Sequence, residues 1–353
     1  MAQVLLLHPP LLLHREFIDY PYLAGLGTWQ AAAGLRAAGH SVNVLDAFCM
    51  PTSGLIDERG GMIRLGVPWA TYVDRLPAQS PDVVVIAASP WLRARAASAE
   101  VRRFIGNLTV RWPGVPTVLA DLDVGGQHVI AWDTDWLDEL GIDLGLRYEA
   151  DHALPTLVSV LASGVRPTER LIKAHPPEDL SLLPMPAYDL VDMDCYARFL
   201  GRVARAGIKR EIFDVSPPIV AIKTSRGCAY SCTFCTATPW RRDGIEGTGW
   251  RALPIESIRT HLMLLRDTYG IRRVIVLDEL VNVRASHFDA LLDLLIALEM
   301  TADFPNGMRA DRLDASQIPK IMQIAPVLSI SAEAATERVA NEIIGKRYDR
   351  EAT

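Results

Sequence analysis

The chain has 353 residues, of which 50% are hydrophobic and 22% charged, and its formal net charge is −6 at pH 7. This composition is typical of a globular protein with substantial cores, and the length suits two domains. The acidic balance disfavours nucleic acid as a partner. Apolar runs such as residues 83–88 are far shorter than the ~20 residues of a membrane-spanning helix. We find no signal peptide ahead of the first apolar run and expect a cytoplasmic protein with no membrane partner.

The first 165 residues alternate short apolar runs with amphipathic stretches. The runs predict β-strands and the stretches predict helices, since their apolar residues recur at helical spacing. This alternation predicts an α/β domain at residues 1–165, built on a doubly wound parallel sheet of the Rossmann-like type. The expected strands are residues 4–8, 40–46, 82–88, 115–120 and 144–148, and the expected helices are residues 22–39, 94–111 and 153–161.

Ligands of open parallel sheets bind beyond the carboxyl ends of the strands, so the loops there form a candidate binding region. Gly25-x-Gly27 lacks the third glycine of a dinucleotide fingerprint, and we give NAD binding little weight. The loops to inspect are residues 9–13, 47–51, 89–91 and 121–126. The candidate cofactor-binding residues in them are Pro10, Ser89, Trp91, Leu122, Gly125 and Gly126.

A proline-rich segment follows at residues 166–217, where helical and strand periodicity fades. Proline favours extended backbone and resists helix formation, so this segment is predicted to be a linker that wraps one domain onto the next.

Three of the five cysteines of the chain fall within eight residues, as Cys228-x-x-x-Cys232-x-x-Cys235. Soft thiolates select iron–sulfur clusters, Zn or Cu(I) over hard cations. A structural Zn site normally has four protein ligands, whereas this loop offers three, which leaves one coordination position open for chemistry. The apolar residues 218–224 predict a strand directly before the loop. An iron–sulfur cluster is therefore the preferred interpretation, with a Zn or other structural thiolate site as the alternative.

This spacing, with an aromatic residue just before the last cysteine, resembles the radical SAM signature. The resemblance implies that Cys228, Cys232 and Cys235 bind a 4Fe–4S cluster whose fourth iron binds S-adenosylmethionine. It implies that one-electron reduction cleaves S-adenosylmethionine to a 5′-deoxyadenosyl radical. It also implies that Phe234 helps to position the adenine.

Residues 218–353 are predicted to form a partial (β/α) radical SAM barrel, with helices at 255–268 and 285–299 and strands at 274–277 and 327–330. At roughly 30 residues for each β/α unit, this part of the chain supplies three or four units, so we expect the barrel to be incomplete at the C-terminus. Four further residues resemble positions that contact S-adenosylmethionine in the family, although alanines replace the glycine and serine around the last of them. They are Asp278, Glu279, Arg309 and Glu333. Solvated strand ends are the alternative interpretation for these positions.

The order of domains, with residues 26–42, 113–119 and 184–188, resembles the cobalamin-binding class of radical SAM proteins. This resemblance implies that cobalamin lies between the N-terminal domain and the barrel. No Asp-x-His-x-x-Gly motif occurs, so we expect base-off cobalamin without a histidine below the cobalt, and Trp91 or Leu122 covering that face. His8, His14 and His128 are therefore not predicted to be ligands.

The function implied is that of a cobalamin-dependent radical SAM enzyme, with methyl transfer to an unactivated carbon as the preferred reaction. The expected substrate is a small molecule or peptide, and the expected electron donor is a flavodoxin or ferredoxin. Radical rearrangement, cyclisation or methylthiolation is the alternative enzyme function. A non-catalytic corrinoid- or metal-binding protein is the alternative outside catalysis.

Overall fold

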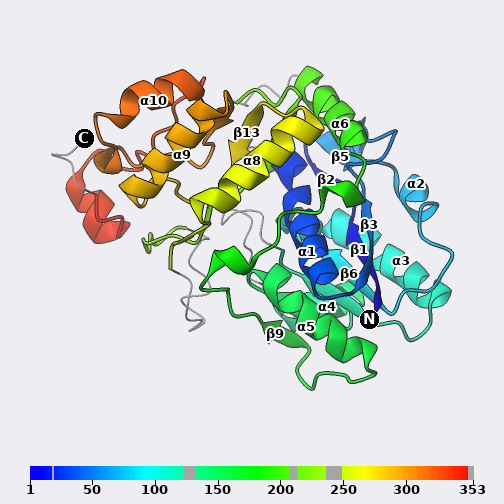
Figure 1. Ribbon diagram of the computed structural model, residues 1–353. Helices are drawn as coiled ribbons and strands as arrows, with labels where there is room; N and C mark the ends of the chain where they lie inside the picture. The colour runs from blue at the N-terminus through cyan, green and yellow to red at the C-terminus, as the bar shows by residue number, and fades with distance from the viewer. Residues whose placement is uncertain (18–19, 123–131, 207–212, 236–248, 349–353) are drawn as a thin grey trace. The chain divides into compact units, whose positions relative to one another are not determined.

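The computed structural model describes residues 1–17, 20–122, 132–206, 213–235 and 249–348 (Figure 1). The described residues form two compact units. The first unit contains residues 1–122, 132–176, 183–206 and 213–217, and the second contains residues 177–182, 218–235 and 249–348.

A six-stranded parallel sheet organises the first unit. When its strands are numbered by their order in the chain, they lie across the sheet in the order 2-1-3-4-5-6. The first five of these positions follow the flavodoxin-like doubly wound order. The four central strands are nearly continuous runs of buried residues, as expected for a parallel sheet covered on both faces, and the two edge strands are partly exposed. In sheet order they are β3 (Ser41–Asp46), β1 (Gln3–His8), β6 (Val83–Ala87), β7 (Thr117–Ala120), β8 (Leu144–Arg147) and β9 (Leu171–Lys173).

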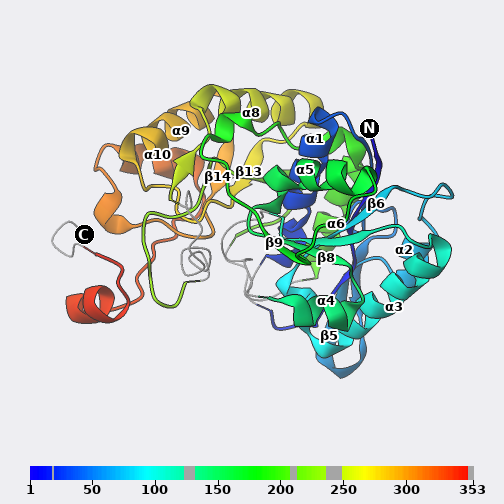
Figure 2. The ribbon, with the colours of Figure 1, turned by 90° about the horizontal axis from the view of Figure 1, so that it is seen from below.

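Helices cover both faces of this sheet. α1 (Gly25–Ala37) and α5 (Ala150–Ala162) pack side by side on one face, and α3 (Arg95–Arg111) and α4 (Thr134–Leu140) pack together on the other (Figure 2). The alanines and leucines of α1 and α5 form a single core with alternate residues of the strands. The predicted doubly wound α/β domain is confirmed.

A second, antiparallel sheet extends the first unit where the sequence predicted only loop at residues 9–13. Leu11, Leu12 and Leu13 are buried and pair with a strand some 50 positions later, a long-range pairing that local periodicity does not reveal. The elements here are β2 (Leu11–His14), β5 (Met62–Gly66), β4 (Gly54–Asp57) and the short helix α2 (Trp69–Val73).

The segment predicted to be an extended linker contains β9 and the helix α6 (Met193–Arg205). Asp192 caps α6 by accepting a hydrogen bond from the backbone N–H of Cys195 at 2.8 Å. Tyr196 and Phe199 are buried, and the Tyr196 hydroxyl donates to the carbonyl of Tyr22 at 3.0 Å. The prolines lie outside α6, so this part of the segment folds as a helix packed into the first unit.

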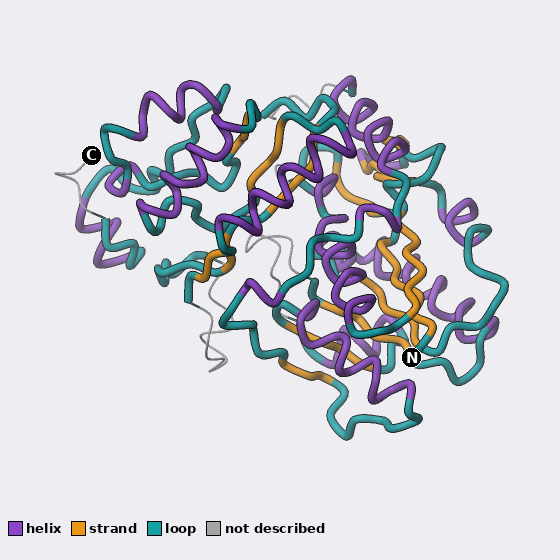
Figure 3. The backbone as a smooth tube through the Cα atoms, in the orientation of Figure 1, coloured by secondary structure: helices purple, strands orange, loops and turns teal. Residues whose placement is uncertain are grey.

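The second unit is built on three parallel strands with helices alongside (Figure 3). The strand predicted at residues 327–330 is wrong: only Ile330 pairs, in an isolated bridge to Met308, and Leu328 is 45% exposed. No closed barrel forms among the described residues of this unit. In order of the chain, its elements are β10 (Ile219–Ile222), β11 (Ser225–Arg226), β12 (Arg251–Ala252), α8 (Ile255–Tyr269), β13 (Arg273–Val276), α9 (Ala285–Ala297), β14 (Thr301–Asp303), α10 (Gln317–Ile324) and the π-helical turn Val339–Ile343.

None of the helices in the described part of the chain combines the length and the apolar character of a membrane span.

Candidate functional site

The three clustered cysteines follow the buried strand β10 in a loop that starts with a tight turn. Gly227 has a φ of 75°, in the left-handed region that side chains rarely adopt, so the chain turns there directly before Cys228. Cys228, Cys232 and Cys235 are half-buried, and none of them forms a disulfide. The loop therefore presents three thiols at the carboxyl end of a parallel strand, where active-site loops of β/α folds lie.

Asp278, at the end of β13, anchors the start of this loop. Its carboxylate is buried and accepts hydrogen bonds from the backbone N–H of Thr224 at 2.7 Å and from the hydroxyls of Thr224 and Ser225, both at 2.6 Å. A carboxylate that receives three donors fixes the backbone of the residues that lead into the cysteines.

Glu279 is likewise held by β10 rather than exposed at a strand end. Its side chain is 4% exposed, and its two carboxylate oxygens lie 2.9 Å and 3.0 Å from the Nζ of Lys223. The paired acids after β13 therefore lie within a hydrogen-bonded connection between the ends of two neighbouring strands. The alternative interpretation of both as solvated strand ends is not supported.

The thiols influence one another electrostatically. Burial, with smaller contributions from Cys235, Glu279 and Cys232, raises the pKa of Cys228 to about 11. Burial and Cys235 also raise the pKa of Cys232. Thiols in this state are protonated at neutral pH, so metal binding must displace protons from them.

Two basic side chains partly offset the raised pKa of Cys232, because Lys346 and Arg309 both lower it. Nearby positive charge stabilises thiolates, and three thiolates are the ligand set of an iron–sulfur cluster with one open iron. In the described residues no three His, Cys, Asp or Glu side chains converge to a geometry that would hold a metal ion. The three thiols and the nearby positive charge thus suit an iron–sulfur cluster. The thiols lie close together in the chain, but their side chains do not point at a common metal position in this structure.

The remaining predicted residues of the second unit have different surroundings. Phe234 is 60% exposed. Arg309 is 1% exposed and forms an ion pair with Asp311 at 2.6 Å. Glu333 forms an ion pair with Lys346. These contacts bring Arg309 and Glu333 together with residues near the end of the described chain.

In the first unit, Pro10 follows β1, and Ser89 and Trp91 follow β6. These adjacent strands form the switch point of the sheet. From β1 the chain continues to β3 on one side, whereas from β6 it continues to β7 on the other side. Ser89 caps the short helix Pro90–Arg93 by accepting a hydrogen bond from the N–H of Trp91 at 3.4 Å. Leu122 is 4% exposed and belongs to the core of the sheet. Gly125, Gly126 and His128 lie outside the described residues.

His8, which we did not predict to be a ligand, belongs to a buried polar cluster at the ends of β1 and β3. Its Nδ1 lies 3.0 Å from a carboxylate oxygen of Asp46, and its Nε2 has no hydrogen-bond partner among the described residues. Asp46 also accepts hydrogen bonds from the indole of Trp29 at 2.9 Å and from the N–H of Phe48 at 2.8 Å. The ring of Phe48 packs edge-on against His8. Sequence reasoning missed this cluster, although an aspartate that ends a strand is a signal for it.

Sequence reasoning also missed Tyr230 and Lys346. Tyr230 lies inside the cysteine motif, and its ring faces the guanidinium of Arg309 at 4.0 Å. Lys346 lies more than 100 positions further along the chain, and no local pattern connects it with the cysteines.

No family model matches the chain. Two curated proteins align with 99% of it at 23% identity: cytidylyl-2-hydroxyethylphosphonate methyltransferase of Streptomyces wedmorensis and anaerobic magnesium-protoporphyrin IX monomethyl ester cyclase of a Synechocystis strain. A solved structure of the radical S-adenosylmethionine methyltransferase TsrM from Kitasatospora setae, with cobalamin and a 4Fe–4S cluster bound, matches 99% of the chain at a TM-score of 0.68 and 16% identity. Along 99% of its length the chain is thus similar, at 16–23% identity, to two curated enzymes and to a radical S-adenosylmethionine methyltransferase of known structure.

The match to these relatives is partial in length. The chain spans 68% of the methyltransferase, 62% of the cyclase and 63% of the TsrM chain. The similarity to TsrM is one of fold, and it extends over both units of this chain.

Proposed function

We propose that this protein is a cobalamin-dependent radical SAM enzyme that transfers a methyl group to an unactivated carbon. The observation that carries the proposal is the three-thiol loop of Cys228, Cys232 and Cys235. The loop follows β10, and Asp278, which follows β13, anchors its start. It occurs in a chain whose first unit is a doubly wound sheet of the kind that binds ligands at its switch point.

The side chains of the second unit would hold and orient the reacting groups. The three thiolates would bind a 4Fe–4S cluster, which supplies the electron that cleaves S-adenosylmethionine. Asp278 and the Lys223–Glu279 pair fix the approach to the loop. The exposed ring of Phe234 offers an apolar surface against which an adenine can pack.

In the first unit, Pro10, Ser89 and Trp91 would contact cobalamin. We keep Gly125 and Gly126, which lie outside the described residues, as further candidates. The topology supports the first assignment, because Pro10 follows β1, and Ser89 and Trp91 follow the adjacent strand β6. We keep Leu122 as a candidate for the cobalt-facing side, although its side chain lies in the core.

The relatives suggest the reaction class. One is named a methyltransferase, another a cyclase, and the solved structure is of a methyltransferase. Methyl transfer is therefore the proposed reaction and ring closure the competing one. The substrate would be a small molecule or a peptide, and a flavodoxin or ferredoxin would deliver the electron.

The test uses the full chain, purified without oxygen and reconstituted with iron and sulfide. We expect about four iron atoms per chain and 5′-deoxyadenosine after addition of reductant and S-adenosylmethionine. Cys228→Ala, Cys232→Ala and Cys235→Ala should each abolish both. Cys49→Ala and Cys195→Ala are the matched controls and should retain both, since these cysteines lie in the first unit.

One tightly bound Zn and no iron would reject the radical SAM function in favour of a structural thiolate site. A cluster and bound cobalamin without 5′-deoxyadenosine would instead favour a corrinoid carrier.

A further inference from the structure

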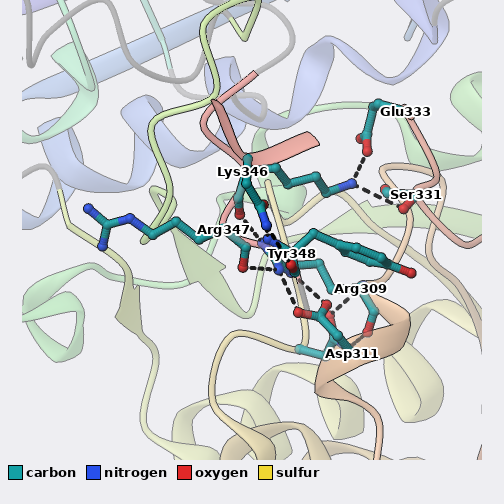
Figure 4. Close-up of polar contacts among 9 residues, drawn as sticks. Arg309, Asp311, Ser331, Glu333, Lys346, Arg347 and Tyr348 are labelled. Atoms are coloured by element: carbon teal, nitrogen blue, oxygen red, sulfur yellow. Dashed lines mark hydrogen bonds and ion pairs between the residues drawn. The ribbon is translucent and has the colours of Figure 1, made fainter. Parts of the chain in front are cut away.

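The guanidinium of Arg309 is buried and almost fully occupied by groups of the protein itself (Figure 4). Its Nε and Nη2 donate to the two carboxylate oxygens of Asp311 at 2.9 Å and 2.6 Å. Its Nη1 donates to the carbonyl of Lys346 at 2.6 Å, and Nη2 donates to the carbonyl of Arg347 at 2.8 Å. An arginine side chain has five N–H donors, so four of them are in use. This leaves Arg309 little capacity to bind the carboxylate of a ligand directly.

The same guanidinium is stacked on the cysteine loop. Its central carbon lies 4.0 Å from the centre of the Tyr230 ring, and Tyr230 lies between the first two cysteines of the motif. A cation over an aromatic face is attracted by the ring, more strongly where water is excluded. The backbone of Arg309 is fixed as well, because its N–H and C=O both pair with the side chain of Asn282, at 3.1 Å and 2.8 Å.

The segment that Arg309 grips is itself attached to the cysteine loop. The carbonyl of Ile344 accepts a hydrogen bond from the N–H of Thr233 at 2.8 Å. Two positions later, the Nζ of Lys346 donates to the carbonyl of Ser331 at 3.0 Å and to the carboxylate of Glu333 (Figure 4). The side chain of Lys346 is 7% exposed. Two buried cations, from Arg309 and Lys346, therefore lie beside the loop.

We propose that Arg309 is a positioning residue that clamps the cysteine loop to residues 346–347, and that Arg309 and Lys346 together supply positive charge that raises the reduction potential of the bound cluster. The proposal rests on the proposed function, since it requires the loop to bind a cluster. Reduction adds one electron to a group already carrying three thiolates. A nearby cation in a medium of low polarity stabilises the reduced form more than the oxidised form.

The test is a redox titration of the reconstituted full chain, with dithionite as reductant and electron paramagnetic resonance as readout. In Arg309→Gln and in Lys346→Gln, the ratio of reduced to oxidised cluster at a fixed potential should fall roughly tenfold, equal to a shift of about 59 mV to more negative potential for a one-electron couple. Arg309→Lys and Lys346→Arg keep the charge and should keep the potential close to that of the wild type. Arg309→Lys should still change the line shape of the signal, since lysine cannot reproduce the forked contacts.

Arg273→Gln is the matched control. Arg273 pairs with the buried Asp303 at 2.6 Å in the same unit. It begins β13 and pairs with the first residue of β10, so it lies at the end of the sheet opposite the cysteine loop. This variant should lose stability without a change in potential.

The outcomes separate the two proposals. A wild-type chain that binds no iron rejects the proposed function. A wild-type cluster whose potential is unchanged in both glutamine variants overturns the present inference and leaves the proposed function intact. If the glutamine variants bind no iron, the charge-conserving variants decide. If Arg309→Lys and Lys346→Arg bind clusters at the wild-type potential, the electrostatic role is supported. If these two variants also fail to bind iron, it is overturned.

Discussion

The Nζ of Lys223 lies 2.9 Å and 3.0 Å from the two carboxylate oxygens of Glu279, and both side chains are less than a tenth exposed. This bidentate pair joins the end of β10 to the end of β13. Asp278 and Thr224, the neighbours of this pair in sequence, are also hydrogen-bonded to each other, so two successive residues beyond each strand are connected. The start of the cysteine loop is thereby fixed by a neighbouring strand.

Replacing Lys223 with methionine should destabilise the protein by about 3–5 kcal/mol, because it removes a cation that pairs with the buried carboxylate of Glu279. The double variant Lys223→Met, Glu279→Met should recover much of that loss, since both members of the buried pair are then replaced by apolar side chains. Urea unfolding of the three proteins measures both effects. Arg259→Ala, which breaks an exposed pair with Glu256, is the control and should cost less than about 1 kcal/mol. Equal losses in Lys223→Met and the double variant would contradict the explanation.

Asp278→Asn should loosen the cysteine loop. The carboxylate accepts two hydroxyls and a backbone N–H, whereas an amide has one acceptor oxygen and would place an NH₂ group against a donor. We expect a stability loss of roughly 1.5–3 kcal/mol and a lower iron content after reconstitution under limiting iron. Iron analysis and urea unfolding check the two effects. Asp267→Asn, at an exposed aspartate of the same unit, should change neither. Full iron loading of Asp278→Asn would show that the anchor is not needed for the loop.

The parallel strands of both units, apart from the short strands β9 and β14, could be predicted from sequence, because each contains a short run rich in apolar residues that carries its own signal. The antiparallel pairing of Leu11 with Leu65 could not, since it depends on residues distant in the chain. The strand predicted around Ile330 failed for a related reason: its apolar residues lack a neighbour to pair with along their length in the described structure.

The same division holds at the site. The cysteine spacing is a local pattern and identifies the loop, and Asp278 and Glu279 were found because they end a strand. Their partners, Thr224 and Lys223, precede the motif and were not assigned a role. The contacts of Arg309 with Tyr230 and with residues 346–347 are tertiary, so they could not be predicted from sequence. From sequence, Arg309 was predicted to bind a ligand instead.

The stability of the protein should fall as the pH is lowered from 7.5 to 5, partly through His261. Burial lowers the pKa of His261 to about 4. In the unfolded chain a histidine has a pKa of about 6.5, so between these values the unfolded state binds more protons and is favoured as the pH falls. Linkage gives a loss of about 2 kcal/mol at pH 5 from this residue. Urea unfolding at both pH values should show a smaller difference for His261→Leu than for the wild type. An unchanged difference would exclude His261 as the source, and His152→Leu, at an exposed histidine, serves as the control.

Cobalamin binding should not depend on His8. Although its Nε2 has no partner among the described residues, the ring is 2% exposed, hydrogen-bonded to Asp46 and packed against Phe48, so its role is structural. The full chain should retain hydroxocobalamin through gel filtration, and His8→Gln should leave its absorption spectrum unchanged while lowering stability. His14→Gln and His128→Gln should leave the spectrum unchanged as well. Trp91→Ala should weaken retention, because the half-buried Trp91 follows β6 at the switch point of the sheet. A spectral shift in His8→Gln at equal retention would instead assign its Nε2 as a cobalt ligand, with Asp46 orienting the ring.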